Sequence, residues 1–208
     1  MLFALLAACT LSTPEPQAAQ PAPSPAIEAG AKAVIGQPAP EFALLDLDGK
    51  PVKLSDHAGK VVVLEWFNPG CPFVKAAYND EVLPQLHDRY ANQEVSYLMI
   101  NSGAAGKQGA GVDENKRAVK SWDISTPVLQ DPSGAVGMAY GAKTTPQIVV
   151  IDRSGVVRFN GALDNAPLSK VEGTRVPYAE QAIDAVLAGG DIETTSPKPW
   201  GCSVKYAQ

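Results

Sequence analysis

The predicted fold follows mainly from "EWFNPGCPFVK" (residues 65–75). This stretch continues "KVVVL", an apolar and β-branched run that is typical of a strand buried on both faces. A turn follows, then Cys71, then a helix that Pro72 opens, because proline suits the first helical position. A cysteine between a buried strand and a helix start is well placed to be reactive. Val74 stands three residues on, so Cys71 has no second cysteine in a local Cys-x-x-Cys pair.

The rest of the chain alternates strands with helices, which implies an α/β domain with a parallel sheet core. Asp48-Gly49 signals a hairpin between two short strands near the start of the domain. The helix from Pro72 is expected to break between Asn79 and Pro84 and to resume to about Tyr90. The last two strands form a hairpin that adds an antiparallel edge. We expect further strands over 60–66, 94–101, 126–131, 144–152 and 155–161, and further helices over 113–122, 133–141 and 177–190.

Cys71 lies where the first turn of the Pro72 helix presents free N–H groups and the positive end of its dipole. Both features stabilise an anion, and the thiolate is the nucleophilic form of cysteine. We therefore expect the pKa of Cys71 to be lowered and its reactivity raised. Lys75, four residues on along the same helical face, can add positive charge. The alternatives are that Cys71 is a small buried apolar residue and that Lys75 is a solvated surface residue.

A second element is "KTTPQIVVID" (residues 143–152), in which Thr145 and Pro146 directly precede a buried strand. The Thr145–Pro146 bond is a candidate for the cis form, because X–Pro bonds alone adopt cis at low cost. A cis bond would turn the chain and leave the backbone edge of Thr145 open to a substrate peptide or thiol. An ordinary trans proline at the start of a strand is the alternative.

The composition is that of a globular protein with a real core, with 45% hydrophobic and 19% charged residues. A net charge of −5 and the lack of basic runs argue against a nucleic-acid surface. Two histidines, neither near a cysteine in sequence, are too few for a histidine-built metal site, so we expect neither metal nor cofactor. "SGAAGKQGAG" (residues 102–111) fails the phosphate-loop pattern, since Gln108 replaces the hydroxyl residue. We interpret it as a flexible surface loop.

The N-terminal segment, residues 1–9, ends in "LLAAC", an apolar run before Cys9 that resembles a bacterial lipobox. It favours a lipid-anchored protein of the cell envelope or periplasm, with lipidated Cys9 as its only membrane contact. The alternative is a trimmed signal peptide or a misplaced start, because the basic n-region is missing. Residues 10–34 are proline-rich and bury too little apolar surface to fold, so we interpret them as a linker. Residues 35–208 make the folded domain and its C-terminal tail.

Cys202 lies in the C-terminal tail "PKPWGCSVKY". With Cys9 lipidated, Cys71 and Cys202 form an even pair, which is consistent with a disulfide in an oxidising compartment. Closing so long a loop contributes about 5 kcal/mol in the chain-entropy model, so a static bridge would be favourable. A redox bridge that opens and closes would look the same in sequence. Trp200 and Tyr206 flank the cysteine and are expected to anchor the tail.

The strand "VVVLEWF", the Cys-Pro helix start and the Thr-Pro before "QIVVID" resemble the thioredoxin superfamily. More narrowly, "WFNPGCPFVKAAY" and "PWGCSVKY" resemble the bacterial peroxiredoxin-like redoxins grouped with alkyl hydroperoxide reductase and thiol-specific antioxidant proteins. The resemblance covers roughly residues 36–208. It implies a thioredoxin-like three-layer α/β fold, whose central mixed sheet carries an N-terminal hairpin and flanking helices. It also implies a reactive Cys71, a cis peptide before Pro146, and supporting roles for Trp66 and Pro72.

The chain departs from this family in two ways. Val74 rules out the Cys-x-x-Cys disulfide of thioredoxins. The peroxiredoxin pattern P-x-x-x-[T/S]-x-x-C has Leu64 and Asn68 in place of its proline and hydroxyl residue. Asn68 can still donate a hydrogen bond, but the residues support thiol chemistry more strongly than peroxidase activity. Glu65, six residues before Cys71, matches the buried acid that relays protons in thioredoxins; a position facing a polar gap is the alternative.

The expected function is that of a thiol-dependent oxidoreductase or antioxidant. Cys71 attacks a peroxide or a disulfide, and Cys202 resolves the sulfenic acid or mixed disulfide, the role that Val74 cannot take. A thiol reductant protein is the implied partner. The alternatives are thiol–disulfide exchange on protein substrates and a non-catalytic lipoprotein whose Cys71–Cys202 bridge is only structural. A copper metallochaperone is disfavoured, because Lys75 stands where such proteins need a second metal-binding cysteine.

Overall fold

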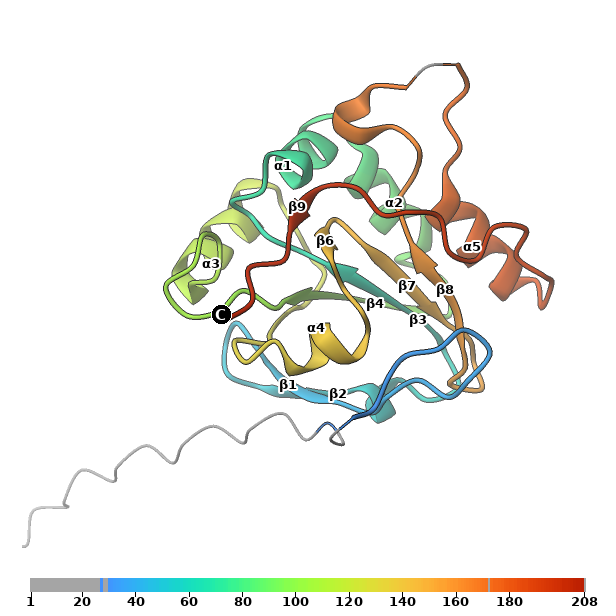
Figure 1. Cartoon of the computed structure of the whole chain (residues 1–208), viewed down its shortest axis with the longest axis horizontal. Coiled ribbons are helices and arrows are strands. Elements are labelled where there is room, and N and C mark those ends of the chain that lie inside the picture. The colour runs from blue at the N-terminus through green and yellow to red at the C-terminus, as the bar shows by residue number, and fades with distance from the viewer. Residues whose placement is uncertain (1–26, 28–29, 172, 208) are drawn as a thin grey trace, which may run out of the picture.

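The computed structural model describes residue 27 and residues 30–171 and 173–207. Its main sheet has seven strands in the order β2-β1-β5-β4-β3-β7-β8 (Figure 1). β3, β4 and β5 run parallel, and an antiparallel hairpin lies at each edge. The strands are β1 (Ala43–Asp46), β2 (Pro51–Lys53), β3 (Val61–Trp66), β4 (Val95–Asn101), β5 (Val128–Gln130), β6 (Thr144–Thr145), β7 (Ile148–Ile151), β8 (Val157–Gly161) and β9 (Cys202–Ser203). This architecture confirms the predicted mixed sheet.

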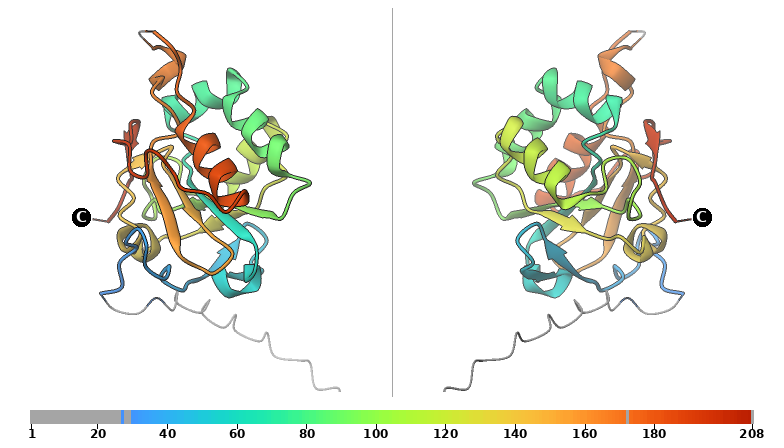
Figure 2. Two further views of the ribbon diagram at one scale, coloured as in Figure 1. Left: turned by 90° about the vertical axis from the view of Figure 1, so that its right-hand side faces the viewer. Right: turned by 90° about the vertical axis from the view of Figure 1, so that its left-hand side faces the viewer.

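Helices cover both faces of the main sheet, as the views in Figure 2 show. Side chains of β3 alternate between two apolar cores: Val61 and Val63 pack with α1, α2 and α5, whereas Val62 and Leu64 pack with α4 on the other face. The helices are α1 (Pro72–Asn79), α2 (Val82–Tyr90), α3 (Val112–Ser121), α4 (Ala135–Ala139) and α5 (Tyr178–Leu187), with short 3-10 turns η1 (Leu54–His57) and η2 (Pro167–Ser169). The three layers of the predicted fold are confirmed.

The break expected within the first long helix is also present. α1 ends at Asn79, and Glu81 has a φ of 61° before α2 begins at Val82. Pro84 therefore lies in the first turn of α2, where its missing N–H breaks no intrahelical hydrogen bond.

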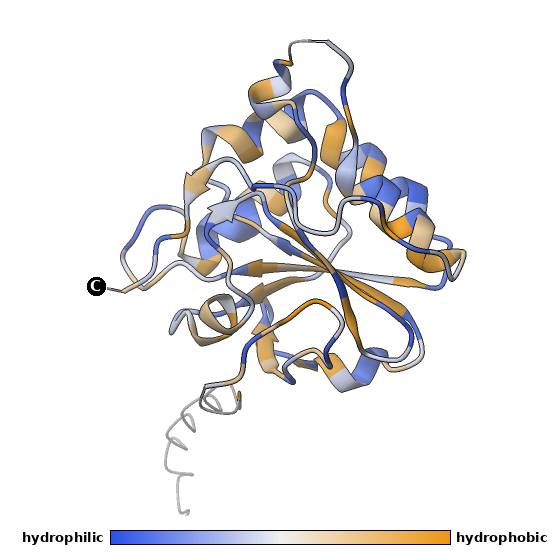
Figure 3. Ribbon diagram, turned by 45° about the vertical axis from the view of Figure 1, so that its right-hand side comes forward, coloured by the Kyte–Doolittle hydropathy of each residue, from blue (hydrophilic) through white to orange (hydrophobic). Residues whose placement is uncertain are grey.

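Apolar residues predominate in the strands of the main sheet, whereas the helices carry both polar and apolar residues (Figure 3). All six residues of β3 are buried, Glu65 included. Within the described residues, no helix has both the length and the apolar character that crossing a bilayer requires.

The chain begins to pack on the domain just before residue 35. Ala33 donates its amide to the Ala139 backbone oxygen at 2.8 Å, and Ile27 contacts the core on the α4 face. The predicted lipidation site at Cys9 and most of the predicted linker lie outside the described residues.

Candidate active site

Cys71 immediately precedes α1. It is the N-cap, with an extended backbone (φ −77°, ψ 124°), and Pro72 follows at the first helical position. Its amide donates to the Asn68 backbone oxygen at 3.0 Å, which closes the turn after β3. Cys71 is 1% exposed and packs in the core beneath α1. The predicted helix start is confirmed, and the thiol lies at the N-terminal end of the helix.

The cis-proline turn meets Cys71 from the other side. The Thr145–Pro146 bond is cis, as predicted, and the Cys71 thiol donates to the Thr145 backbone oxygen at 3.2 Å. The prediction that the edge of Thr145 is open is wrong, because β6 pairs with β9 of the tail. Their antiparallel register sets Thr145 opposite Cys202. The chain's own tail therefore covers this edge and brings its cysteine to Cys71.

Two aromatic side chains hold the tail on either side of Cys202. The indole N–H of Trp200 donates to the Asp164 backbone oxygen at 2.6 Å. The hydroxyl of Tyr206 donates to the Ala142 backbone oxygen at 2.7 Å. These contacts confirm the predicted anchoring. Both cysteines of this site are free thiols, one buried and one half-buried.

The two thiols have opposite electrostatic environments. Burial opposes ionisation of Cys71, but hydrogen bonds from the Cys202 thiol, from Thr145 and from the Val74 amide outweigh it and lower the pKa of Cys71. The pKa of Cys202 is raised, first by burial and then by its hydrogen bond to Cys71 and by the Cys71 charge, while Lys205 opposes the rise. Because the thiolate is the nucleophile, Cys71 is the more reactive member of the pair.

The structure does not bring every predicted site residue to Cys71. Lys75 is exposed on α1, and the groups that lower the pKa of Cys71 do not include it. Trp66 is fully buried on the opposite face of the sheet, where its indole N–H donates to the Ser102 hydroxyl at 3.1 Å. The supporting roles of Lys75 and Trp66 stay predictions, and the structure gives neither side chain a contact with the Cys71 thiol.

Asn68 links the Cys71 turn to the glycine-rich loop of residues 102–111. Its side-chain oxygen accepts the Gly70 amide at 2.8 Å, and its side-chain nitrogen donates to the Gln108 backbone oxygen at 3.0 Å. Gln108 donates in return to the Gly70 backbone oxygen at 2.9 Å. Only residues 105–108 and 111 of this loop are exposed. The interpretation of the whole loop as free surface is therefore wrong, because its buried part packs on the Cys71 turn.

Comparison with known proteins agrees with this site. The model of the AhpC/TSA family matches residues 35–160, which contain Cys71 and the cis-proline turn. The chain belongs to the AhpC/TSA family. Cys202 lies beyond the matched residues, so the tail cysteine is supplied by the part of the chain that the family model does not describe.

Two characterised proteins and a solved structure are similar to this AhpC/TSA-family protein. It is similar to thiol-disulfide oxidoreductase ResA of Bacillus thuringiensis, with 29% identity over 126 residues, covering 61% of this chain and 68% of ResA. It is also similar to the chloroplastic 2-Cys peroxiredoxin BAS1 of Spinacia oleracea, with 22% identity over 181 residues, covering 80% of this chain and 64% of BAS1. A hypothetical protein of Sinorhizobium meliloti superposes with a TM-score of 0.76 and 28% identity, covering 85% of this chain and 96% of that one. The predicted thioredoxin-superfamily redoxin is confirmed, and with it thiol-dependent oxidoreductase activity.

Glu65 of this family member makes a buried polar cluster that the sequence did not reveal. The side chain is fully buried, and one carboxylate oxygen contacts His87 Nε2 at 3.0 Å and accepts the Tyr97 hydroxyl at 3.0 Å. The other oxygen has no hydrogen-bond partner among the described residues. Burial, followed by the charge of Glu65, raises the pKa of Tyr97 well above its ordinary value. A role as proton relay for Cys71 stays a prediction.

Replacing Glu65 with Ala should lower the free energy of unfolding by about 1–3 kcal/mol, because it leaves the half-buried partners His87 and Tyr97 without their acceptor. Glu65→Gln, which keeps an acceptor oxygen, should lose less. Urea denaturation measures both variants. Equal losses for Ala and Gln would contradict the assigned hydrogen bonds. The Glu65→Gln variant also tests the predicted proton relay from Glu65 to Cys71. If the pH dependence of turnover is the same in this variant and in the wild type, Glu65 is not a proton relay.

The hydroxyl of Thr145 is a second buried group that makes no hydrogen bond among the described residues while Cys71 is a protonated thiol, although it helps to lower the pKa of Cys71. It can donate to the Cys71 thiolate, and hydrogen bonds to charged groups contribute about 1.5–3 kcal/mol. Thr145→Val should therefore move iodoacetamide labelling of Cys71 to higher pH and slow it about tenfold at neutral pH. Thr145→Ser, which keeps the hydroxyl, is the control. Labelling of the Val variant at the wild-type rate would exclude this donor.

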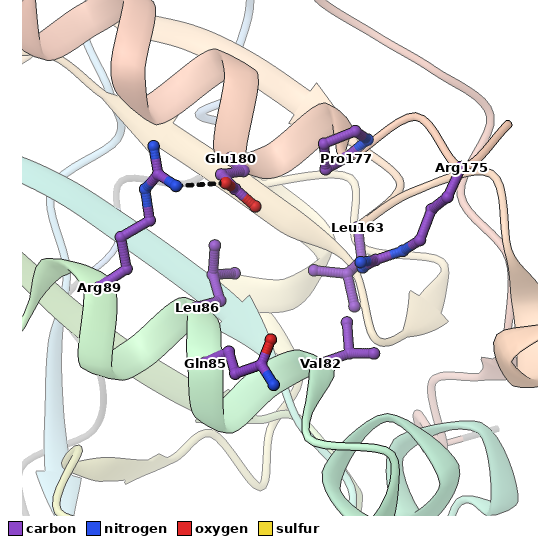
Figure 4. Close-up of a pocket in the computed structure, with 8 residues that line it drawn as sticks. All are labelled: Val82, Gln85, Leu86, Arg89, Leu163, Arg175, Pro177 and Glu180. Atoms are coloured by element: carbon purple, nitrogen blue, oxygen red, sulfur yellow. Dashed lines mark hydrogen bonds and ion pairs between the residues drawn. The ribbon is translucent and has the colours of Figure 1, made fainter.

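A separate hollow of about 250 Å³ lies between α2 and α5 (Figure 4). Arg89 and Arg175 stand on either side of it, over an apolar floor. Both are already paired with carboxylates, Arg89 with Glu180 and Asp184, and Arg175 with Asp164. Neither cysteine lines the hollow. Because both arginines already pair with carboxylates, we assign no ligand to it. Within the described part of the chain, no cluster of histidine, cysteine and acidic side chains is arranged to hold a metal ion.

Proposed function

We propose that this protein is a peroxiredoxin-like thiol oxidoreductase that uses Cys71 and Cys202 of one chain. The observation that carries the proposal is the β6–β9 pairing, which holds Cys202 opposite Thr145 while the Cys71 thiol contacts the Thr145 backbone oxygen. A peroxide is the oxidant we favour, because a thiol that is 1% exposed is closed to a protein surface, whereas a peroxide needs a much smaller opening to reach it.

The first step is attack of the Cys71 thiolate on the peroxide. One peroxide oxygen is transferred to sulfur, the O–O bond breaks, and the other oxygen leaves and takes up a proton as water or an alcohol. Cys71 is thereby oxidised to a sulfenic acid. Val74 N–H and the Thr145 side chain stabilise the attacking thiolate.

The second step is attack of Cys202 on the sulfenic acid, which forms the disulfide and releases water. The charge of the Cys71 thiolate is one of the causes that raise the pKa of Cys202. The sulfenic acid is neutral, so this cause disappears once the first step is complete, and Cys202 then loses its proton more readily. The difference between the pKa values of the two thiols therefore sets the order in which Cys71 and Cys202 react. A thiol reductant protein supplies two electrons and two protons to restore both cysteines.

Protein thiol–disulfide exchange is the second candidate, favoured by the similarity to thiol-disulfide oxidoreductase ResA. A sulfenic-acid probe distinguishes the two in the Cys202→Ser variant after one equivalent of hydrogen peroxide. We expect dimedone, which labels sulfenic acids, to label about one Cys71 per molecule of hydrogen peroxide added. If Cys71 stays reduced under peroxide but forms a mixed disulfide with an oxidised protein, the peroxidase proposal is wrong and the second candidate stands.

An envelope location with a lipid on Cys9 also remains a proposal, supported by the lipobox-like sequence before Cys9. Metabolic labelling with a fatty acid should label the wild type and not Cys9→Ser. Equal labelling of both proteins would contradict the anchor.

A further inference from the structure

The edge of Thr145 is a strand-binding site that the chain's own tail fills. β6 and β9 pair in antiparallel register. The ladder is extended by the Val204 amide, which donates to the Lys143 backbone oxygen at 3.0 Å. Beyond it, the Ala104 amide donates to the Lys205 backbone oxygen at 2.8 Å. An extended peptide that adds to an exposed strand uses the same kind of main-chain hydrogen bonds.

Gly201 shows how closely this tail fits. Its φ is 129°, and a Cβ added there would lie 2.2 Å from the Thr145 backbone oxygen. A side chain at this position would therefore push the backbone of the tail away from Thr145. The glycine immediately before Cys202 allows the cysteine to approach Cys71.

The tail is held along its length as a strap across the site, and Figure 1 shows its path from α5 to β9. Before the site it follows β8, where the Ala162 amide donates to the Pro197 backbone oxygen at 3.1 Å. Trp200 and Tyr206 then anchor it on either side of Cys202. A polypeptide disulfide that approaches Cys71 along Thr145 meets an occupied edge, whereas a peroxide needs no such edge.

We propose that residues 200–206 determine the class of oxidant by excluding polypeptide disulfides from Cys71 while they are docked on Thr145. The proposal rests on Cys71 being the attacking thiol. When the tail is released, the Cys71 thiolate attacks one sulfur of a polypeptide disulfide. A new S–S bond joins Cys71 to that sulfur, the old S–S bond breaks, and the other sulfur leaves as a thiolate.

The test compares four full-length proteins that all carry Cys202→Ser. The parent has no other change, and the other three add Gly201→Ala, Trp200→Ala or Gly190→Ala. Gly201→Ala weakens docking of the tail by a clash with Thr145, and Trp200→Ala weakens it by removing an anchor. Gly190→Ala is the matched control, since its Cβ would meet only the Ala185 backbone oxygen, at 3.6 Å. Hydrogen exchange at the Val204 amide reports release of the tail.

Each protein reacts with two disulfides that share the leaving group thionitrobenzoate, one on free cysteine and one on the cysteine of a peptide matching residues 198–207. The ratio of the two rates cancels any change in the thiolate fraction of Cys71. We expect this ratio to rise about tenfold or more in the Gly201→Ala and Trp200→Ala proteins, because the open fraction of the site increases. It should not change in the Gly190→Ala protein.

An unchanged ratio in proteins whose Val204 amide exchanges faster would overturn the proposal. A parallel reaction with hydrogen peroxide separates the two hypotheses. If Cys71 forms no sulfenic acid in any of the four proteins and the ratio still rises, the peroxidase function fails and the selective role of the tail stands.

Discussion

Replacing Cys202 with Ser should stop turnover after a single reaction of Cys71. The attacking sulfur belongs to Cys71, and serine keeps the backbone that pairs with Thr145. Serine also keeps a hydroxyl that can donate to the Cys71 thiolate in place of the Cys202 thiol. Without Cys202, the oxidised Cys71 can be resolved only by an external thiol. The effective molarity of a thiol held in place within the same chain is far above the concentration of free thiols in a cell. Steady-state peroxide consumption should fall by more than about a hundredfold. Sulfenic acid should accumulate at Cys71 and overoxidise with excess peroxide.

Stopped-flow measurement separates the first turnover from the steady state in this variant. Ser203→Ala is the matched control, because Ser203 is the exposed neighbour on β9 and contributes no thiol. The control should turn over at close to the wild-type rate. Wild-type turnover by the Cys202→Ser protein would show that Cys202 is not the resolving residue.

Gly109→Ala should destabilise the protein and disturb Cys71, although residue 109 lies far from Cys71 in sequence. Gly109 has a φ of 76°, and a Cβ there would lie 1.8 Å from the Asn68 side-chain oxygen. That oxygen accepts the Gly70 amide just before Cys71. The substitution therefore combines a strained backbone with overpacking, which alone typically costs about 1–3 kcal/mol.

Gly106→Ala is the control for this prediction. Its φ of 78° is nearly the same, but a Cβ there would meet no atom within 4 Å. Chemical denaturation should show that Gly109→Ala loses about 1–3 kcal/mol more than Gly106→Ala. Labelling of Cys71 should change only in the Gly109→Ala protein. Equal stabilities of the two variants would contradict the packing of the loop on the Cys71 turn.

Local patterns were enough to predict the strands of the main sheet and the α-helices. The buried run before Trp66 reads as a central strand, and Pro72 marks a helix start. Both signals depend on neighbours in sequence. Cys71 could also be predicted as reactive from its neighbours in sequence, since the Val74 amide in the first turn of α1 is one of the groups that lower its pKa.

Contacts between distant segments could not be predicted in this way. β6 and β9 have two residues each, too short for any periodicity, and they are joined across more than fifty residues. Glu65 meets His87 and Tyr97 only because β3, β4 and α2 pack together. Glycines in residues 102–111 suggested a flexible loop, whereas Gly109 is there because the Asn68 side chain leaves no room for a Cβ.

The most direct test of the proposed cycle is peptide mapping of the wild-type protein after one equivalent of hydrogen peroxide, with free thiols blocked in acid. We expect one disulfide that joins Cys71 to Cys202 within a single chain and is restored to two thiols by a dithiol reductant. Cys71 oxidised to a sulfenic or sulfinic acid beside a free Cys202 thiol, or a disulfide between two chains, would contradict it.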